Sequence, residues 1–297
     1  MAKNKTIFVC RSCGYKSSKW LGKCPECGDW NSFNEEAVSV KNKAYGKSMN
    51  KPRATPLTLT SVPEETRFST GILELDRVLG GGLVLGEIVL IGGEPGIGKS
   101  TILLHLLANL AKGGKTVLYV SGEESPNQIL LRANRLKISE KKLYLATETE
   151  TERIKELTDD IKPAVLAIDS IQTVVCEDVS SASGSISQIR ETTARLVEYA
   201  KEKNVPVILV GHVTKDGTLA GPKVMEHMVD CVLYFEGERT HSLRLLRTMK
   251  NRYGSTNEIG VFKMQENGMK EVKNPSEIFL AERPINVPGS VVVPTIE

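Results

Sequence analysis

The 297-residue sequence has no apolar run near the roughly 18 residues that a membrane-spanning helix requires. Its apolar runs, such as residues 88–91 and 207–210, are short and typical of strands. The first ten residues include lysines but no hydrophobic segment long enough for a signal peptide. The sequence also has no internal repeat. We therefore expect a cytoplasmic protein that does not associate with membranes.

The composition is that of a chain that folds, with 40% apolar and 25% charged residues, which excludes a wholly disordered or fibrous protein. The net charge of +3 conceals an asymmetry, because residues 1–60 carry 11 Lys and Arg against 4 Asp and Glu. The remaining residues carry 28 against 32. The basic front is either a contact for an acidic partner or a solvated arm, and charge alone favours the arm.

Composition divides the chain into a cysteine-rich module (residues 1–33), a flexible polar linker (34–65), a core (66–275) and a tail (276–297). In the core, short apolar runs alternate with segments of helical period, which predicts an α/β fold with a mostly parallel sheet. Strands are predicted at 87–91, 116–121, 142–146, 165–169, 206–210 and 231–235. Helices are predicted at 99–112, 126–136, 151–160 and 186–203. Alternation at 241–249 and 258–265 predicts paired antiparallel strands, followed by a hairpin turn at 266–268.

A complete phosphate-binding pattern, G-x-x-x-x-G-K-[ST], occupies residues 93–100. It follows a predicted strand and opens a predicted helix, where backbone N–H groups can surround phosphate oxygens. We expect Lys99 to reach the β- and γ-phosphates of ATP and Thr101 to approach the α-phosphate. The predicted nucleotide-binding residues are Gly93, Glu94, Pro95, Gly96, Ile97, Gly98, Lys99, Ser100 and Thr101.

Two further groups would complete a hydrolytic site. Asp169 ends an apolar strand and is expected to hold Mg²⁺ together with the Ser100 hydroxyl. Glu123 and Glu124 follow the predicted strand 116–121, where either carboxylate can orient or deprotonate the attacking water. Local spacing does not distinguish them, and we take Glu123 as catalytic with Glu124 as the alternative.

Four of the six cysteines form two C-x-x-C pairs separated by ten residues, each pair followed by glycine. Such pairs present four thiolates to one tetrahedral ion, and disulfides are rare in cytosolic proteins. We therefore expect a structural zinc site, with iron as the alternative metal. The predicted ligands are Cys10, Cys13, Cys24 and Cys27. The other two cysteines, Cys176 and Cys231, are expected to be reduced and buried.

Two tryptophans, Trp20 and Trp30, flank the second cysteine pair. Exposed indole rings can stack on nucleic-acid bases. A module this small also needs aromatic side chains for its own core, so we expect both tryptophans to pack inside it.

Three motifs carry a resemblance to a known family. Residues 70–82 (T-G-I-x-x-L-D-x-x-L-G-G-G) lead into the phosphate loop and resemble the RecA/KaiC superfamily. With the four-cysteine module, residues 211–217 (G-H-V-T-K-D-G) and 250–254 (K-N-R-Y-G) are similar to the bacterial RadA (Sms) DNA-repair family. The resemblance covers residue 10 to the C-terminus. Tyr253 stands where the family usually has phenylalanine, which keeps the aromatic ring.

The resemblance implies a RecA-like P-loop ATPase core, preceded by a small four-cysteine zinc finger, that works as a ring, typically a hexamer. It implies a DNA-dependent ATPase of recombinational repair that binds single-stranded and branched DNA and promotes branch migration. Recombinase or replication proteins are further expected partners. Members of the family carry a C-terminal Lon-like domain, and we expect this domain to be absent because the chain ends near where it would begin.

The resemblance also gives roles to four basic residues. Lys250 and Arg252 are expected to project into the ATP site of a neighbouring subunit, where a guanidinium can stabilise the charge that develops during phosphoryl transfer. The loops 173–187 and 212–226 lie on the side where RecA-like proteins contact DNA, with Lys215 and Lys223 as the expected DNA-binding residues. His212 either senses the γ-phosphate or packs.

A function of a different class fits many of the same features. A KaiC-like core can bind ATP as a switch and use the zinc finger to recruit a protein partner. DNA-independent turnover would favour this ATP-switched adaptor, whereas salt-sensitive DNA binding would favour the repair ATPase. A zinc-finger transcription regulator is disfavoured because the finger lacks a histidine pattern and a base-reading helix.

Overall fold

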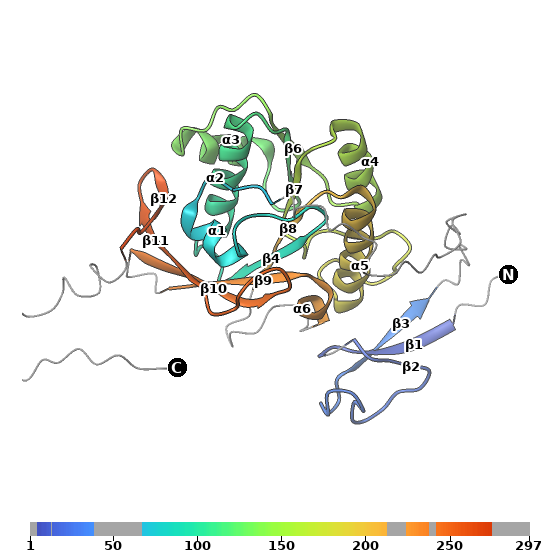
Figure 1. Ribbon diagram of the computed structural model, residues 1–297. Helices are drawn as coiled ribbons and strands as arrows, with labels where there is room; N and C mark the ends of the chain where they lie inside the picture. The colour runs from blue at the N-terminus through green and yellow to red at the C-terminus, as the bar shows by residue number, and fades with distance from the viewer. Residues whose placement is uncertain (1–4, 13, 39–66, 213–223, 238–241, 275–297) are drawn as a thin grey trace, which may run out of the picture.

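The computed structural model describes residues 5–12, 14–38, 67–212, 224–237 and 242–274 (Figure 1). The N-terminal part is an antiparallel sheet of β1 (Lys5–Cys10), β2 (Lys16–Ser17) and β3 (Phe33–Val38), with β1 in the centre. Strand β3 extends the module five residues beyond the predicted boundary at residue 33, because every residue up to Val38 pairs with β1. The rest of the predicted linker and the predicted tail lie outside the described residues.

The second sheet has nine described strands in the order β12-β11-β10-β9-β4-β8-β7-β5-β6. Six of them form the parallel part, which confirms the mostly parallel α/β core. They are β4 (Ile88–Gly93), β5 (Val117–Ser121), β6 (Leu143–Thr147), β7 (Val165–Asp169), β8 (Val207–Val210) and β9 (Cys231–Glu236). An antiparallel extension continues from β9 through β10 (Leu243–Asn251), β11 (Ile259–Gln265) and β12 (Gly268–Glu271).

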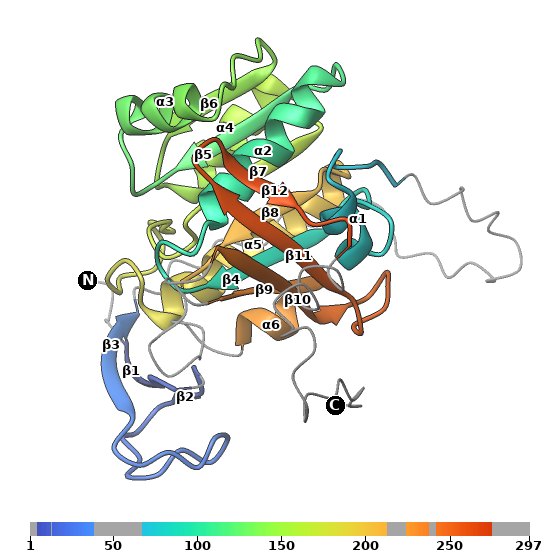
Figure 2. The ribbon, with the colours of Figure 1, turned by 90° about the vertical axis from the view of Figure 1, so that its left-hand side faces the viewer.

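Helices cover both faces of this sheet (Figure 2). The helices α1 (Leu73–Leu79), α2 (Lys99–Lys112) and α3 (Pro126–Arg135) pack on one face. The helices α4 (Thr151–Ile161), α5 (Ile186–Lys203) and α6 (Val224–Met228) pack on the other. Within the described residues, no helix is both long and apolar enough to span a membrane.

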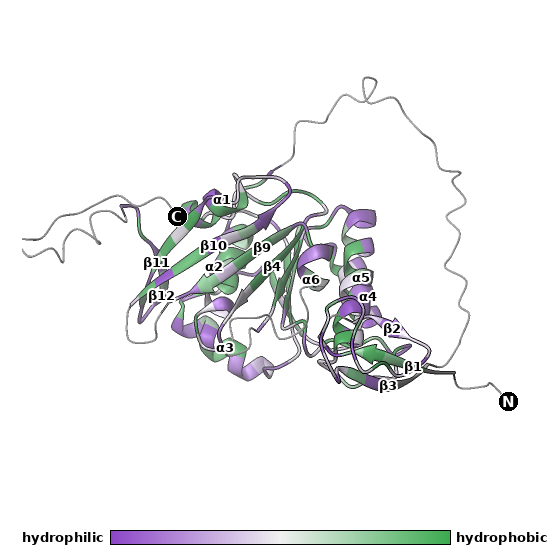
Figure 3. Cartoon of the chain, turned by 90° about the horizontal axis from the view of Figure 1, so that it is seen from below, coloured by the Kyte–Doolittle hydropathy of each residue, from purple (hydrophilic) through white to green (hydrophobic). Residues whose placement is uncertain are grey.

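Alternation along the strands builds two buried clusters. In β4, Val89 and Ile91 enter the cluster under α1 and α2, whereas Ile88 and Leu90 enter the cluster under α5. A strand buried on both faces therefore needs a continuous apolar run, and the sequences of these strands have such runs. Figure 3 shows hydrophobic central strands and hydrophilic outer turns of α3 and α4.

The predicted parallel strands and helices are confirmed to within two residues at each end. Local signals explain this agreement, as at α3, where Ser125 and Gln128 form a capping box and Pro126 takes the first turn. The sequence did not predict α1, α6 or β12. Helix α1 begins at Leu73, and the residue before it, Ile72, provides no side-chain cap, so the usual local start signal is missing.

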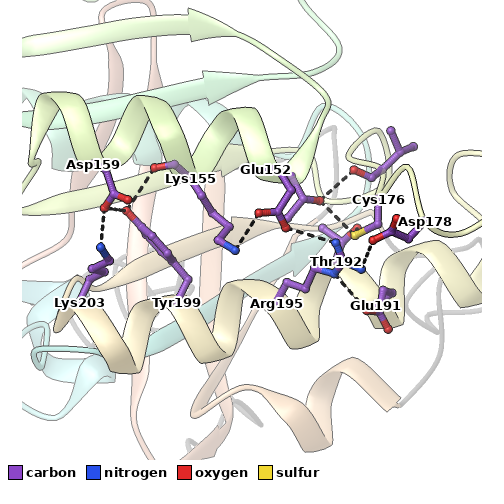
Figure 4. A network of polar contacts seen from close by, with 12 residues as sticks. Glu152, Lys155, Asp159, Cys176, Asp178, Glu191, Thr192, Arg195, Tyr199 and Lys203 are labelled. Carbon is purple, nitrogen blue, oxygen red and sulfur yellow. Dashed lines mark hydrogen bonds and ion pairs between the residues drawn. The ribbon is translucent and has the colours of Figure 1, made fainter. Parts of the chain in front are cut away.

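A polar network joins α4, α5 and the loop after β7 (Figure 4). Arg195 on α5 binds Glu152 at 3.2 Å, Asp178 at 3.2 Å and Glu191 at 3.0 Å. Cys176 in this loop is buried and reduced, as predicted. One arginine thus connects two helices to the loop 173–187.

Candidate functional site

A cavity of about 370 Å³ lies where the parallel strands end. Gly93 ends β4, Ser121 ends β5 and Asp169 ends β7, so three carboxyl ends meet at one edge of the sheet. The lining residues are Pro95, Gly96, Gly98, Lys99, Ser100, Thr101, Ser121, Glu123, Glu124, Arg132, Arg135, Asp169 and His212. Of the predicted loop residues, Gly93 and Ile97 are buried behind this lining and Glu94 is exposed beside it. The phosphate loop therefore ends at the N-terminus of α2, where backbone N–H groups and the helix dipole favour phosphate.

Lys99 is folded onto its own loop. Its ammonium Nζ donates to the Gly93 carbonyl at 2.7 Å and the Glu94 carbonyl at 2.9 Å, and the residue is only 4% exposed. Burial lowers the pKa of Lys99 to about 8, against the opposing effects of Asp169 and Glu123. A bound phosphate would supply the missing negative charge, so Lys99 suits the role of phosphate ligand.

The back of the phosphate loop is supported by strands from the end of the core. Arg244 on β10 donates from Nε to the Ile97 carbonyl at 3.2 Å. A Cβ at Gly98 would lie 2.4 Å from the Met269 methyl carbon on β12, and Gly98 has a φ of 121°. The backbone conformation therefore favours glycine at this position, because L side chains rarely adopt this φ, whereas the methionine methyl could shift. Sequence analysis missed both supports.

Asp169, which the sequence analysis expected to hold magnesium, is buried at the end of β7. Its Oδ2 accepts a hydrogen bond of 2.8 Å from the Tyr119 hydroxyl. Burial, followed by the charge of Asp169, raises the pKa of Tyr119, so the phenol stays protonated and orients the carboxylate. Ser100 lines the same cavity, and this carboxylate and hydroxyl are oxygen ligands of the kind that Mg²⁺ prefers.

The two candidate glutamates have different partners. Glu123 accepts a hydrogen bond from Ser170 Oγ, and its Oε1 lies 3.1 Å from His212 Nε2. The hydrogen bond to His212 is the largest cause that lowers the pKa of Glu123, which keeps this carboxylate ionised. Glu124 is held by both terminal nitrogens of Arg132, with one N–O distance of 2.7 Å. Since Arg132 engages both oxygens of Glu124, the geometry favours Glu123 as the group that orients water.

His212 connects the cavity to the second predicted DNA loop. Its Nε2 contacts Glu123, its carbonyl accepts from Gln172 Nε2 at 3.5 Å, and its Nδ1 is buried without a hydrogen-bond partner among the described residues. The next described residue is Val224, so Lys215 and Lys223 lie outside the described residues.

The first predicted DNA loop, 173–187, is closely tied to α5. The Oε1 atom of Gln188 accepts a hydrogen bond of 2.8 Å from the Cys176 N–H. Its Nε2 donates to the Val179 carbonyl at 2.8 Å and to the Ser181 carbonyl at 3.1 Å. The exposed residues of this loop include acidic Asp178, which pairs with Arg195. The loop is therefore more ordered and more acidic at its surface than its serine and glycine content suggested.

Lys250 and Arg252 are not among the described residues that line this cavity. Lys250 donates to the carbonyls of Glu226 (2.7 Å), His227 (3.2 Å) and Val229 (2.7 Å), at the end of α6. Arg252 is more accessible, with 55% of its side chain exposed, and its one ion pair among the described residues is with the buried Asp230, at 3.5 Å from Nε. Its trans role remains a prediction, and of the pair Arg252 has the freer side chain.

The turn that carries Arg252 is clamped to the loop after α1. Arg67 donates to the carbonyls of Gly80 and Tyr253, and a Cβ at Gly80 would lie 2.9 Å from the Gly254 Cα. The two glycine-containing motifs of the sequence therefore meet, with no room for a side chain between them.

The described thiols at the N-terminus are arranged for a metal ion. The Sγ atoms of Cys10, Cys24 and Cys27 lie within 4.8 Å of one another, and those of Cys10 and Cys27 are 3.7 Å apart. Tetrahedral zinc with bonds of about 2.3 Å separates its sulfurs by roughly 3.8 Å. These residues fit a structural zinc site, while the fourth predicted ligand, Cys13, lies outside the described residues.

The prediction that both tryptophans pack inside the module is wrong. Trp20 is 53% exposed and Trp30 is 68% exposed. The small core contains Cys10, Cys24 and Phe33, with Phe8, Tyr15 and Leu21 packed against it. Cysteines that gather at the predicted metal site occupy the interior, so the indoles are not needed there.

Comparisons with known proteins agree with this architecture. The KaiC family model matches residues 68–278, and a rubredoxin metal-binding-domain model matches residues 8–35. Proteins named DNA repair protein RadA are similar over all of this chain, with 52% identity in Listeria monocytogenes, 52% in Halalkalibacterium halodurans and 51% in Bacillus subtilis. The chain spans 65–66% of the length of these relatives. It belongs to the KaiC family of ATPases, and its predicted resemblance to the bacterial RadA proteins is confirmed.

Proposed function

We propose that this chain is an ATP-hydrolysing DNA-repair protein that binds single-stranded DNA, assembles into a ring and promotes branch migration. The observation that carries the proposal is the connection from the nucleotide cavity to the DNA-side loop. Glu123, beside the expected γ-phosphate, contacts His212, which begins the loop 212–226. The printed names of the similar proteins support the repair role.

In the proposed reaction, Lys99 and the phosphate loop hold the triphosphate, and Ser100 and Asp169 would hold Mg²⁺. Mg²⁺ held by these oxygens would supply neutralisation of phosphate charge, and Glu123 orients the attacking water. Arg252 of a neighbouring subunit completes the site in the ring. Loss of the γ-phosphate changes the surroundings of Glu123, and His212 passes that change to the loop that contacts DNA.

The test is steady-state ATP hydrolysis with and without single-stranded DNA. We expect DNA to stimulate turnover and Lys99→Ala to abolish it. Lys112→Ala is the matched control, because Lys112 is an exposed lysine at the far end of the same helix. Stimulation that survives Lys99→Ala would contradict the assigned site.

The ATP-switched adaptor makes the opposite prediction. An assembled protein with DNA-independent turnover and ATP-dependent capture of a protein partner would replace the repair ATPase. A repair ATPase should lose DNA affinity steeply as salt rises, because phosphate contacts release counterions. Lys215→Ala and Lys223→Ala should each reduce that salt dependence.

A further inference from the structure

The zinc ribbon, residues 5–38 as described, exposes aromatic surface that its fold does not require. Trp20 and Trp30 are the only tryptophans of the chain, and more than half of each side chain is accessible. The other aromatics of the ribbon behave normally, since Tyr15 and Phe33 pack edge to face at 6.4 Å. Tryptophan is usually buried unless it faces a ligand or interface.

Both indoles lie at the base of one hairpin, residues 22–31. The Asn31 N–H donates to the Gly22 carbonyl at 2.8 Å, and Lys23 pairs with Trp30 in an antiparallel bridge. A Cβ at Gly22 would lie 3.8 Å from the ring of Trp20. Trp30 lies on the same face of the hairpin as Lys23, whereas Trp20 lies beside Gly22, whose Cβ direction is toward the opposite face. The two rings therefore flank the base of the hairpin.

Positive charge accompanies the rings. The Lys23 ammonium lies 5.5 Å from the centre of the Trp30 ring, and Lys16 and Lys19 are exposed before the hairpin. The hairpin also carries two acids, because Glu26 is exposed at its turn and Asp29 accepts hydrogen bonds from Ser12 Oγ and the Trp30 N–H.

We propose that Trp20, Trp30 and Lys23 form a base-stacking surface for single-stranded DNA, separate from the loops of the ATPase core. A nucleotide joins a flat base to an anionic phosphate, and this surface places an ammonium beside an indole. Stacking on an aromatic ring accepts any base, so the surface fits a protein that handles varied sequences. The identity of the ligand rests on the proposed function.

Both tryptophans lie in the ribbon, so their fluorescence reports on this surface alone. The zinc-loaded chain is titrated with unlabelled oligothymidylate while tryptophan emission is followed. A second titration follows the anisotropy of a labelled oligothymidylate, which detects binding anywhere on the chain. We expect quenching to saturate together with the anisotropy.

Variants separate stacking from folding. Replacing both tryptophans by alanine should weaken binding by roughly 5- to 150-fold for each base that loses its stack. Trp20→Phe with Trp30→Phe should retain part of the affinity, and Lys23→Ala should weaken binding less than the alanine pair. Tyr144→Ala is the control, because Tyr144 is an aromatic residue 47% exposed on β6. Zinc content is measured for every variant to verify the ribbon fold.

Three results would overturn the inference. A rise in anisotropy with unchanged tryptophan emission would place all DNA contacts in the core and leave the proposed function intact. Unchanged anisotropy and unchanged emission would remove DNA as the ligand and contradict the proposed function as well. Quenching by a protein partner but not by oligothymidylate would assign the surface to the adaptor role.

Discussion

The ATPase core and the zinc ribbon reach a stable fold by different means. In the core, apolar side chains fill both faces of a nine-stranded sheet, and even Tyr119 is fully buried. In the ribbon, the buried cluster consists of Cys10, Cys24 and Phe33, and both tryptophans are exposed. Where cysteines that gather at a metal site occupy the interior, the large tryptophan side chains stay at the surface.

The largest expected effect is that of zinc removal, which should unfold the zinc ribbon and leave the ATPase core folded. Structural zinc contributes about 10–16 kcal/mol to small zinc-dependent folds. A chelator or Cys24→Ser should unfold the ribbon, seen as altered tryptophan emission, and leave nucleotide binding by the core unchanged. Loss of nucleotide binding on chelation would mean that the two regions are coupled.

Within the core, substitutions of Glu123 and Glu124 should affect the rate of ATP hydrolysis differently while leaving the stability of the fold nearly unchanged. Glu123→Gln should lower kcat by about 10²- to 10⁴-fold, the usual contribution of a general base, with little change in melting temperature. Glu124→Gln is the matched control and should retain most activity, because its main partner is Arg132. The measurement is ATP turnover at saturating DNA, and equal losses in both variants would return Glu124 as a candidate.

A smaller effect concerns a buried acid that is specific to the core. Glu87 is fully buried, its Oε1 has no hydrogen-bond partner among the described residues, and burial raises its pKa from 4.5 to about 7. Because the folded chain keeps this proton longer than the unfolded chain, stability falls as pH rises from about 4.5 to 7. The loss amounts to roughly 3 kcal/mol above that range.

Glu87→Gln should remove this dependence, because the amide oxygen can still accept from the Val84 N–H. The variant should gain stability over the wild type at pH 8 and gain little at pH 4.5, as measured by chemical unfolding. Glu258→Gln, at a partly exposed ion pair with Arg77, should leave the pH profile unchanged. An identical profile for Glu87→Gln would show that this carboxyl does not titrate abnormally.

The elements near the nucleotide were predictable because their signals are local. A glycine-rich pattern between a strand and a helix predicted the phosphate loop at residues 93–100. An apolar run ending in a carboxylate predicted that Asp169 lies at the end of a strand. Contacts between distant segments left no such signal. The Tyr119 hydroxyl on Asp169 and the Arg244 support of Ile97 depend on which strands become neighbours, and that order was not in the local pattern.

The ambiguity between Glu123 and Glu124 had the same origin, since adjacent residues differ only in their tertiary partners. The tryptophans were wrongly assigned for another reason. A core estimate based on apolar content ignores the space that a metal and its thiolates occupy. The sequence contained the cysteine spacing, but its consequence for Trp20 and Trp30 needed the packed structure.

The support of the phosphate loop by late strands has a consequence for synthesis on the ribosome. Loop residues Ile97 and Gly98 leave the ribosome long before Arg244 and Met269, which support them. Until β10–β12 have emerged, the phosphate loop of a nascent chain lacks its contacts with Arg244 and Met269. We expect nucleotide to act as a folding ligand only late in translation, and a ribosome-arrested chain ending at residue 240 to resist proteolysis equally with and without ATP.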